Sequence, residues 1–353
     1  MMKKKGRFRG LQIAAVYASV FLGAGFASGQ ELLRYFVSFG PVGIWGLVLT
    51  GVLFSLVGWT VLSICRKHGV STYSQFMQHL LGKRLGMIME WLVITFLFCL
   101  FVAMLAGAGA TARQAFNLPF TIGAVVVGVI VYIVLRFDLE GMVKINVILA
   151  PFMIIGGIII GLFSVLVQVQ PTFAMPGRGL MVGWVISAVL YASYNLVTGV
   201  PILAATSPMA EKKSDPFVGG VLGGAAITVL GLCMALPLFL HYSQVINFEI
   251  PFLVVVMRYG TLINVLFIAV FVSAIVTTAV CNGFAVVQWL HSHINIPKRQ
   301  AALFLCIAGV LAAHIGFSNI VLYVYPIFGL LGLFKVIVIL YHGYARMRGK
   351  DIT

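Results

Sequence analysis

The chain has 353 residues, of which 61% are hydrophobic and only 9% are charged. A soluble domain carries roughly 25% charged residues, so this composition excludes a soluble protein and indicates that lipid is the main solvent. The net charge of +15 would suggest a nucleic-acid partner in a soluble chain, but here the basic residues cluster in short stretches between apolar runs, as in membrane proteins.

The apolar runs predict an all-α membrane fold, with a single transmembrane domain that covers residues 1–353. A membrane-spanning helix needs about 20 mostly apolar residues, and ten runs meet this requirement. In chain order they are 11–38, 41–65, 87–113, 118–136, 142–167, 181–206, 217–241, 260–290, 300–317 and 320–343. A cleaved signal peptide is the alternative for the first run, but that run continues to Phe39 and carries Glu31 and Arg34.

The basic residues orient these spans. With the N-terminus in the cytoplasm, the inside loops and termini hold 18 of the 23 lysines and arginines. An even number of spans also returns the basic C-terminus to the cytoplasm, so the charge bias and the span count agree. We therefore expect a multi-pass protein of a bacterial cytoplasmic (inner) membrane, with both termini cytoplasmic.

Two stretches between spans predict short helices outside the bundle. Residues 71–81 place their apolar side chains on one helical face, which predicts an amphipathic helix on the cytoplasmic surface. Residues 244–258 are apolar but too short to cross, which predicts a hairpin or short helix over the outer side. The five cysteines are scattered without a CxxC pair, and we interpret them as packing residues.

Two spans contain residues that disfavour a helix in mid-membrane. The first span has three glycines and several polar side chains within residues 23–31, and each glycine costs about 1 kcal/mol relative to alanine in a helix. The sixth span contains Gly199 and Pro201, and a proline removes one backbone donor while its ring clashes one turn back. We predict that both helices are broken. The alternatives are a close-packing glycine face in the first span and a simple kink at Pro201.

The two predicted breaks lie half a chain apart. Spans one to five, residues 11–167, start inside, whereas spans six to ten, residues 181–343, start outside. A broken helix at the start of two halves of opposite topology is typical of an inverted-repeat transporter with a site at the membrane midplane. Unwound backbone at that depth is tolerated where it lines a cavity or is buried in protein.

The stretch GAGFASGQE (residues 23–31), after a basic N-terminus, resembles the YkvI-type bacterial membrane proteins. These are regarded as permeases of the amino acid–polyamine–organocation superfamily with the LeuT fold. The resemblance covers the whole chain in length and span count, and the EIPFL segment (249–253) is similar to the outer segment between spans seven and eight of that superfamily. It implies a 5+5 inverted repeat with helices 1 and 6 broken, and an amino acid or related amine as the substrate.

By this resemblance, the two breaks line the substrate pocket, and spans three, eight and ten complete it. The candidate substrate-binding residues are Gly23, Ala24, Gly25, Phe26, Ala27, Ser28, Gly29, Tyr194, Asn195, Thr198 and Gly199. The positive end of a half-helix would hold an anionic group of the substrate. The aromatic side chains of Phe26, Tyr191 and Tyr194 would suit an apolar group or a cation.

The coupling ion is Na⁺ or H⁺, and the candidate ion-coupling residues are Glu31, Ser273, Thr277 and Thr278. A carboxylate within the bilayer is costly and so is a functional candidate by default, with pairing to Arg34 as the alternative for Glu31. The hydroxyls of the eighth span match the sodium ligands of this fold, although such hydroxyls often bond their own helix. Proton-coupled relatives place a lysine in the fifth span, where this chain has only Lys144 near the start.

Lys335 lies centrally in the last span and must reach water, pair or face a cavity, and both a functional and a structural role stay open. His291 and His293 lack a third ligand, so we expect no metal site and no cofactor.

Together these features predict an ion-coupled secondary transporter of a small solute that works by alternating access. A channel, or a solute-sensing receptor that keeps a transporter fold, is the alternative. An enzyme is not expected, because the chain lacks HExxH and GxSxG, and residues 25–29 only approach the latter. The expected partners are the solute and the lipid bilayer, not nucleic acid, and the oligomeric state stays open.

Overall fold

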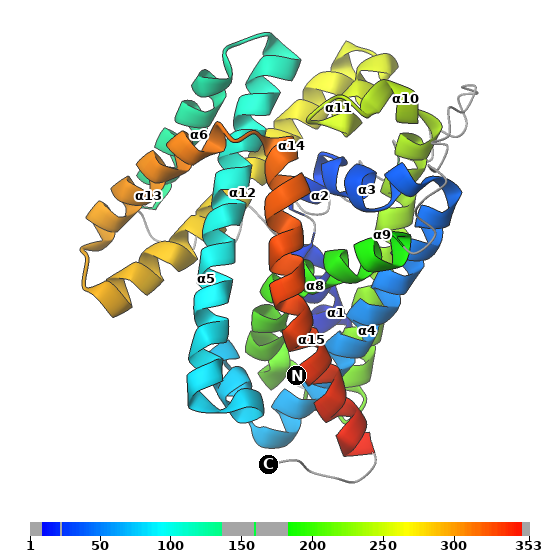
Figure 1. Cartoon of the computed structure of the whole chain (residues 1–353), viewed down its shortest axis with the longest axis vertical. Helices are drawn as coiled ribbons and strands as arrows, with labels where there is room; N and C mark the ends of the chain where they lie inside the picture. Colours follow the sequence, from blue (N-terminus) through cyan, green and yellow to red (C-terminus); the bar gives the residue numbers. More distant parts are fainter. Residues whose placement is uncertain (1–8, 22, 136–158, 160–182, 348–353) are drawn as a thin grey trace, which may run out of the picture.

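The computed structural model describes residues 9–21, 23–135, 159 and 183–347, and this part of the chain is almost entirely helical (Figure 1). The predicted fifth span, 142–167, lies outside the described residues apart from position 159. The helices are α1 (Arg9–Val20), α2 (Ala24–Ala27), α3 (Gln30–Tyr35), α4 (Gly43–His68), α5 (Tyr73–Phe116), α6 (Phe120–Val134), α8 (Gly183–Thr206), α9 (Asp215–Leu240), α10 (Tyr242–Val245), α11 (Pro251–Val256), α12 (Thr261–Ile294), α13 (Lys298–Ala313), α14 (Phe317–Asn319) and α15 (Tyr325–Met347), with short segments η1 (Val37–Val42), η2 (Ser207–Met209), η3 (Met257–Tyr259) and η4 (Ile320–Val324).

Six helical stretches within these residues are long and apolar enough to cross a membrane. They are Val37–His68, Tyr73–Phe116, Gly183–Met209, Asp215–Leu240, Thr261–Ile294 and Phe317–Ala345. The apolar helix α6 has 15 residues, α13 has 16, and the first predicted span is divided into α1, α2 and α3. The protein is therefore a multi-pass membrane protein, while the count of ten spans and the 5+5 repeat stay predictions.

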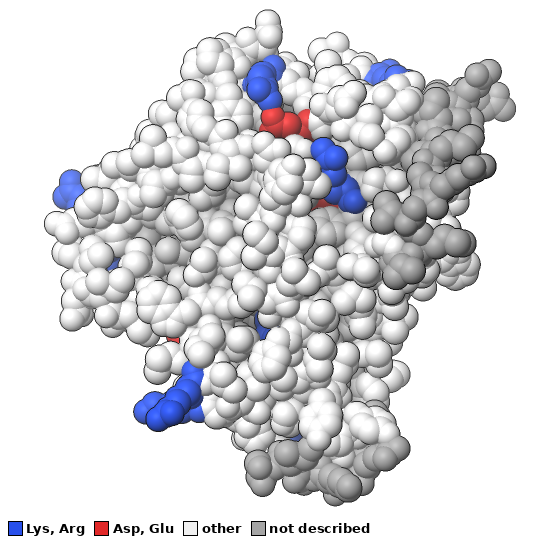
Figure 2. Space-filling model, in the orientation of Figure 1, with Lys and Arg blue, Asp and Glu red and all other residues white. Residues whose placement is uncertain are grey.

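The outer surface suits a lipid solvent. Large apolar side chains such as Trp45, Leu262, Phe304 and Leu311 are 65–74% exposed. The face shown in Figure 2 carries charged side chains mainly toward its ends and few across its middle. A water-soluble protein would cover these positions, so the surface is consistent with helices that contact hydrocarbon.

Glycines bring α4 and α9 into close contact. A Cβ atom added at Gly58 would lie 3.0 Å from the Cα atom of Gly220, and one added at Gly220 would overlap the backbone nitrogen of Trp59. Lipid supplies no hydrophobic drive for helices to associate, so membrane helices gain stability from such close backbone packing. These glycines therefore have a packing role, separate from any binding role.

Both predicted extramembrane segments form short helices. Residues 73–81 make a separate helical arm of α5, because Gly82 (φ 75°) interrupts the helix, and Phe76 and Met77 on the predicted apolar face are fully buried. The stretch 244–258 contains the end of α10, α11 and η3. In Figure 1, α10 and α11 cap the upper end of the molecule.

The two predicted helix breaks have different outcomes. The first is confirmed, since α1 ends at Val20 and the chain continues as two short helices. The second is wrong, because α8 is helical from Gly183 to Thr206 with Pro201 inside it. The ammonium of Lys335 on α15 donates to the carbonyl of Leu196 at 2.9 Å, so a neighbouring helix supplies a hydrogen bond in the stretch of α8 that precedes the proline.

Candidate functional site

The interrupted first span forms a buried, irregular segment between α1 and α3. Gly29 has φ 79°, a left-handed conformation that favours glycine, and it begins α3. The hydroxyl of Ser28 donates to the carbonyl of Gly25 at 2.7 Å and accepts from the amide of Gln30 at 3.1 Å. The carbonyl of Ser28 accepts from the amide of Phe252 at 2.9 Å, so α11 also contacts the break. All residues from Ala24 to Glu31 are buried.

Glu31 folds back over this segment. Its side chain is 7% exposed, and a Cβ atom added at Gly25 would lie 2.8 Å from its Cδ atom and overlap Oε1. The hydroxyl of Tyr194 on α8 donates to Oε2 at 2.9 Å. Only glycine at position 25 leaves space for the carboxylate there. The structure thus brings together three residues that the sequence singled out: Gly25, Glu31 and Tyr194.

Four tyrosines surround this carboxylate, and we name Tyr35, Tyr191, Tyr194 and Tyr325 the tyrosine cluster. Tyr194 is central, with ring centroids 5.5, 5.3 and 4.9 Å from those of Tyr35, Tyr191 and Tyr325. All four lie close enough to Glu31 for an electrostatic interaction with its carboxylate. The hydroxyls of Tyr35 and Tyr325 are buried without a hydrogen-bond partner, whereas the hydroxyl of Tyr191 lies near the carboxylate of Glu31. Unsatisfied buried hydroxyls are costly and point to a functional role.

Glu31 has no ion-pair partner within the described residues, whose ion pairs are Arg9–Glu211 and Arg113–Glu249. The alternative pairing with Arg34 is not seen, because Arg34 donates to the hydroxyl of Ser318 at 3.0 Å. The cluster is therefore an acidic site lined by aromatic rings and hydroxyls.

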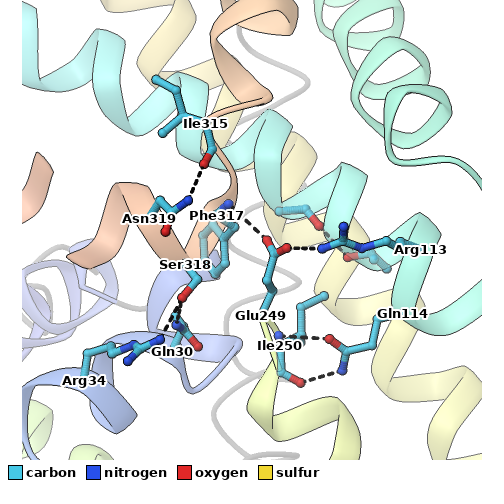
Figure 3. A network of polar contacts seen from close by, with 12 residues as sticks. Gln30, Arg34, Arg113, Gln114, Glu249, Ile250, Ile315, Phe317, Ser318 and Asn319 are labelled. Carbon is cyan, nitrogen blue, oxygen red and sulfur yellow. Dashed lines mark hydrogen bonds and ion pairs between the residues drawn. The ribbon is translucent and has the colours of Figure 1, made fainter. Parts of the chain in front are cut away.

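A polar network lies between α11 and its neighbours at the upper end of the molecule (Figure 3). Glu249 pairs with Arg113 of α5 and accepts from the amide of Phe317 at 3.1 Å. Gln114 exchanges two hydrogen bonds with the backbone of Ile250, at 2.9 and 3.1 Å. On the other side, Gln30 and Arg34 both contact the hydroxyl of Ser318, at 2.7 and 3.0 Å. We name these contacts the α11 network, and they join α3, α5, α11 and α14.

A small pocket adjoins the cluster on the side of α4 and α9. Phe26, Phe54, Tyr191 and Thr228 are among its lining residues, and it has room for about one water molecule. Because Tyr191 belongs to both the pocket and the cluster, the two spaces are neighbours.

Other predicted polar residues bond their own helices. The side chains of Asn195 and Thr198 donate to the carbonyls of Tyr191 and Asn195, and those of Ser273 and Thr277 to Ala269 and Ala274. Thr278 lies beside the break, since its Cγ2 atom is 3.9 Å from a Cβ atom added at Gly23. The roles of these residues stay predictions.

Lys335 is fully buried between helices. Besides its bond to Leu196, its ammonium lies 5.5 Å from the ring centroid of Tyr73. This arrangement agrees with the structural pairing that the sequence left open.

Sequence reasoning missed Tyr35, Tyr325 and Phe96 as site residues. Tyr35 stands four positions after Glu31, so the helical period could have placed it on the same face. Phe96 of α5 packs on Tyr194 and Tyr325, with centroids 6.0 and 5.8 Å apart. No local pattern places Phe96 or Tyr325 at the site.

Two proteins of Bacillus subtilis (strain 168) match the chain over most of their length. The uncharacterized membrane protein YkvI is 25% identical over 328 residues, which cover 91% of this chain and 92% of YkvI. The chain is thus similar to YkvI. The uncharacterized protein YyaD is 27% identical over 319 residues, with 90% and 92% covered. These matches confirm the resemblance predicted from residues 23–31. No protein-family model matches the chain.

The similar solved structures are transporters of the LeuT fold. A manganese transporter of Eremococcus coleocola superposes with a TM-score of 0.66 at 14% identity, over 96% of this chain and 80% of that one. MhsT in complex with L-phenylalanine gives 0.64 at 14% identity, over 94% and 88%. Mhp1 in an inward-facing conformation gives 0.57 at 13% identity, over 93% and 75%. At such low identity the likeness shows the fold alone.

Proposed function

We propose that this protein is an ion-coupled secondary transporter of a small solute, an amino acid or a related amine, and that it works by alternating access. The site is the interrupted first span together with Glu31 and the tyrosine cluster. We place the protein in a bacterial cytoplasmic membrane with both termini inside, on the charge bias of its loops.

One observation carries the proposal: a buried carboxylate lies against an unwound segment in a helical membrane protein. Glu31 is 7% exposed, contacts the break at Gly25 and is held by Tyr194 of α8. An ionisable residue inside a membrane protein is costly, and irregular backbone at that depth is tolerated where it is buried in protein or lines a cavity. The two features at one place fit a binding site better than a packing site.

The contacts around the site fit a carrier that opens to one side at a time. The α11 network closes the upper end by joining α3, α5, α11 and α14. Beside the cluster, Phe96 packs on Tyr325 and on Phe328, with ring centroids 5.8 and 4.7 Å apart. Separation of either group of contacts would open the site toward one side, which is the behaviour that alternating access requires.

The coupling ion is Na⁺ or H⁺, and each has a candidate place. A proton would act on Glu31, which can take it up and release it. A sodium ion would lie between the break and α12, where Thr278 stands beside Gly23. Thr277 and Ser273 would have to give up the bonds that they donate to their own helix.

Reconstitution tests this function. Thermal stability in detergent is first measured with amino acids and amines, in sodium or potassium buffer, since a bound ligand raises the melting temperature. A stabilising solute is then offered to proteoliposomes with a sodium gradient, a proton gradient or neither. The expected result is saturable uptake that only one gradient drives above equilibrium. Uptake that no gradient concentrates would indicate a channel, and binding without uptake would indicate a receptor.

A further inference from the structure

The acidic site has no fixed counter-charge among the described residues. Arg34, three residues after Glu31, donates to Ser318 instead. A buried carboxylate needs compensation, which a proton or a mobile cation can supply. A single hydrogen bond from Tyr194 satisfies only part of the hydrogen-bonding capacity of the carboxylate. The second oxygen, Oε1, faces Gly25 and the break.

The walls around this carboxylate suit an organic cation. Three tyrosine rings from α3, α8 and α15 have centroids within 5.5 Å of that of Tyr194, and aromatic faces attract cations. Two of their hydroxyls, on Tyr35 and Tyr325, are buried without partners and can accept N–H groups. Carboxylate, ring faces and free acceptors are the groups that an ammonium ion needs.

The same site does not suit an anion or a metal. A substrate carboxylate would have to rely on backbone N–H groups alone and would lie beside the carboxylate of Glu31, because the described residues bring no lysine, arginine or histidine into ion-pair distance of Glu31. A hard divalent cation needs about six oxygen ligands. In the described part of the chain, no three His, Cys, Asp or Glu side chains gather closely enough to hold a metal. The site thus favours an amine over a zwitterionic amino acid.

We propose that the site binds a small organic ammonium ion, with the charged nitrogen between Glu31 and the tyrosine cluster. This inference rests on the proposed function and narrows its substrate class from amino acids and amines to amines. The neighbouring pocket, with Phe26, Phe54 and Thr228 in its lining, takes the apolar part of the ligand. Because that pocket holds about one water molecule, a ligand larger than this requires α4 or α9, which supply most of the lining, to move away from Phe26 and Tyr191.

Ligands of similar size and different charge test the proposal on the wild-type protein. Calorimetry in detergent compares ethylammonium, L-alanine, propionate and propanol. Ethylammonium is expected to bind at least tenfold more tightly than the other three. Tighter binding of L-alanine or propionate, or no binding of ethylammonium, would overturn the proposal without any variant.

Two sets of variants locate the ion. Glu31→Gln keeps the shape of the side chain and is expected to weaken ethylammonium at least tenfold, whereas Glu211→Gln, at an exposed ion pair with Arg9, is expected to change nothing. Tyr325→Leu removes an aromatic ring and is expected to weaken ethylammonium binding by between threefold and about thirtyfold. Tyr325→Phe keeps the ring and should weaken binding less. The control Tyr323→Leu changes a side chain that is 65% exposed and should leave binding unchanged. Unchanged affinity in Glu31→Gln would refute the site.

Uptake measurements separate this inference from the proposed function. Ethylammonium binding that depends on Glu31, without solute uptake by proteoliposomes, supports the site and contradicts the transporter. If a solute is taken up and has the same affinity for the Glu31→Gln variant as for the wild-type protein, the proposed site is contradicted and the transport function is supported. The melting temperature of each variant without ligand shows whether it is folded.

Discussion

The first span and α8 both contain residues that disfavour a helix, yet only the first is interrupted. The first span leaves the helix after Val20 and again between α2 and α3, whereas α8 passes through Gly199 and Pro201 without a break. The proline is the stronger helix breaker of the two residue types, at about 3 kcal/mol against about 1 for glycine. The comparison teaches that neighbouring groups, more than the breaking residue itself, decide where a membrane helix opens.

The neighbours differ in kind. At α8, Lys335 donates to the carbonyl of Leu196, and Gly199 lies so close to Phe21 that an added Cβ atom would be 2.8 Å from its Cζ atom. At the first span, Phe252 of α11 donates to the carbonyl of Ser28, which stabilises an opened backbone. Each segment keeps the conformation whose polar groups its neighbours satisfy.

Gly25→Ala should have the largest effect on transport, because it removes the space in which Glu31 meets the break. The new methyl group would overlap Oε1 of Glu31, so the carboxylate or the backbone must move. Overpacking of this kind costs about 1–3 kcal/mol. We expect solute uptake to be lost and the melting temperature to fall, as measured in proteoliposomes and by thermal unfolding.

Gly23→Ala is the matched control, two residues earlier in the same segment. Its Cβ atom would meet only Cγ2 of Thr278, at 3.9 Å, which is ordinary van der Waals contact. Because Gly23 also borders the proposed sodium position, we expect uptake to fall, but much less than in Gly25→Ala. Equal losses in both variants would show that the segment needs glycine flexibility rather than space for Glu31.

Lys335→Met should stabilise the protein while loosening α8. Burying the ammonium of Lys335 costs several kcal/mol. Its hydrogen bond to Leu196 and its contact with the ring of Tyr73 offset about 2–4 kcal/mol of that cost. Replacement by an apolar side chain is therefore expected to raise the free energy of unfolding by about 1–2 kcal/mol. The carbonyl of Leu196 loses a donor, so amide exchange near Pro201 should become faster. A lower melting temperature would contradict this balance of charge burial and hydrogen bonding.

Local sequence patterns predicted what local physics determines. Apolar runs located the six long spans, and the arm at 73–81 followed from its apolar face. The glycines and polar residues of 23–31 predicted the first break, and Glu31 stood out as an acid inside an apolar run. The 5+5 repeat and the count of ten spans depend on residues 136–182, most of which the structure does not describe.

The rest depended on contacts between distant segments. The continuity of α8 involves Lys335, which is 139 residues away from Leu196 in the chain. Tyr325 and Phe96 reach the site through tertiary packing, and no spacing in the sequence relates them to Glu31. The α11 network likewise joins residues 68 to 288 positions apart.

Gln114→Leu should loosen the first span from outside. Its amide makes two hydrogen bonds with the backbone of Ile250, and α11 then holds Ser28 through Phe252. Loss of two hydrogen bonds of about 1 kcal/mol each is expected to destabilise this end by about 2 kcal/mol. Amide exchange in residues 26–31 should become faster, whereas the exposed control Gln300→Leu should leave it unchanged.

Pro201→Ala should have the smallest effect on stability. It tests why α8 stays helical without a break. The substitution restores an amide hydrogen that can bond the carbonyl of Val197, which is next to the carbonyl that Lys335 bonds, so a better-bonded helix at this point should depend less on Lys335. In a double-mutant cycle with Lys335→Met, we expect a coupling energy of about 0.5–1 kcal/mol in the exchange of amides near Leu196. Strict additivity would show that Lys335 and Pro201 act independently. In that case, packing of α8 against its neighbours, rather than the bond from Lys335, would account for its continuity.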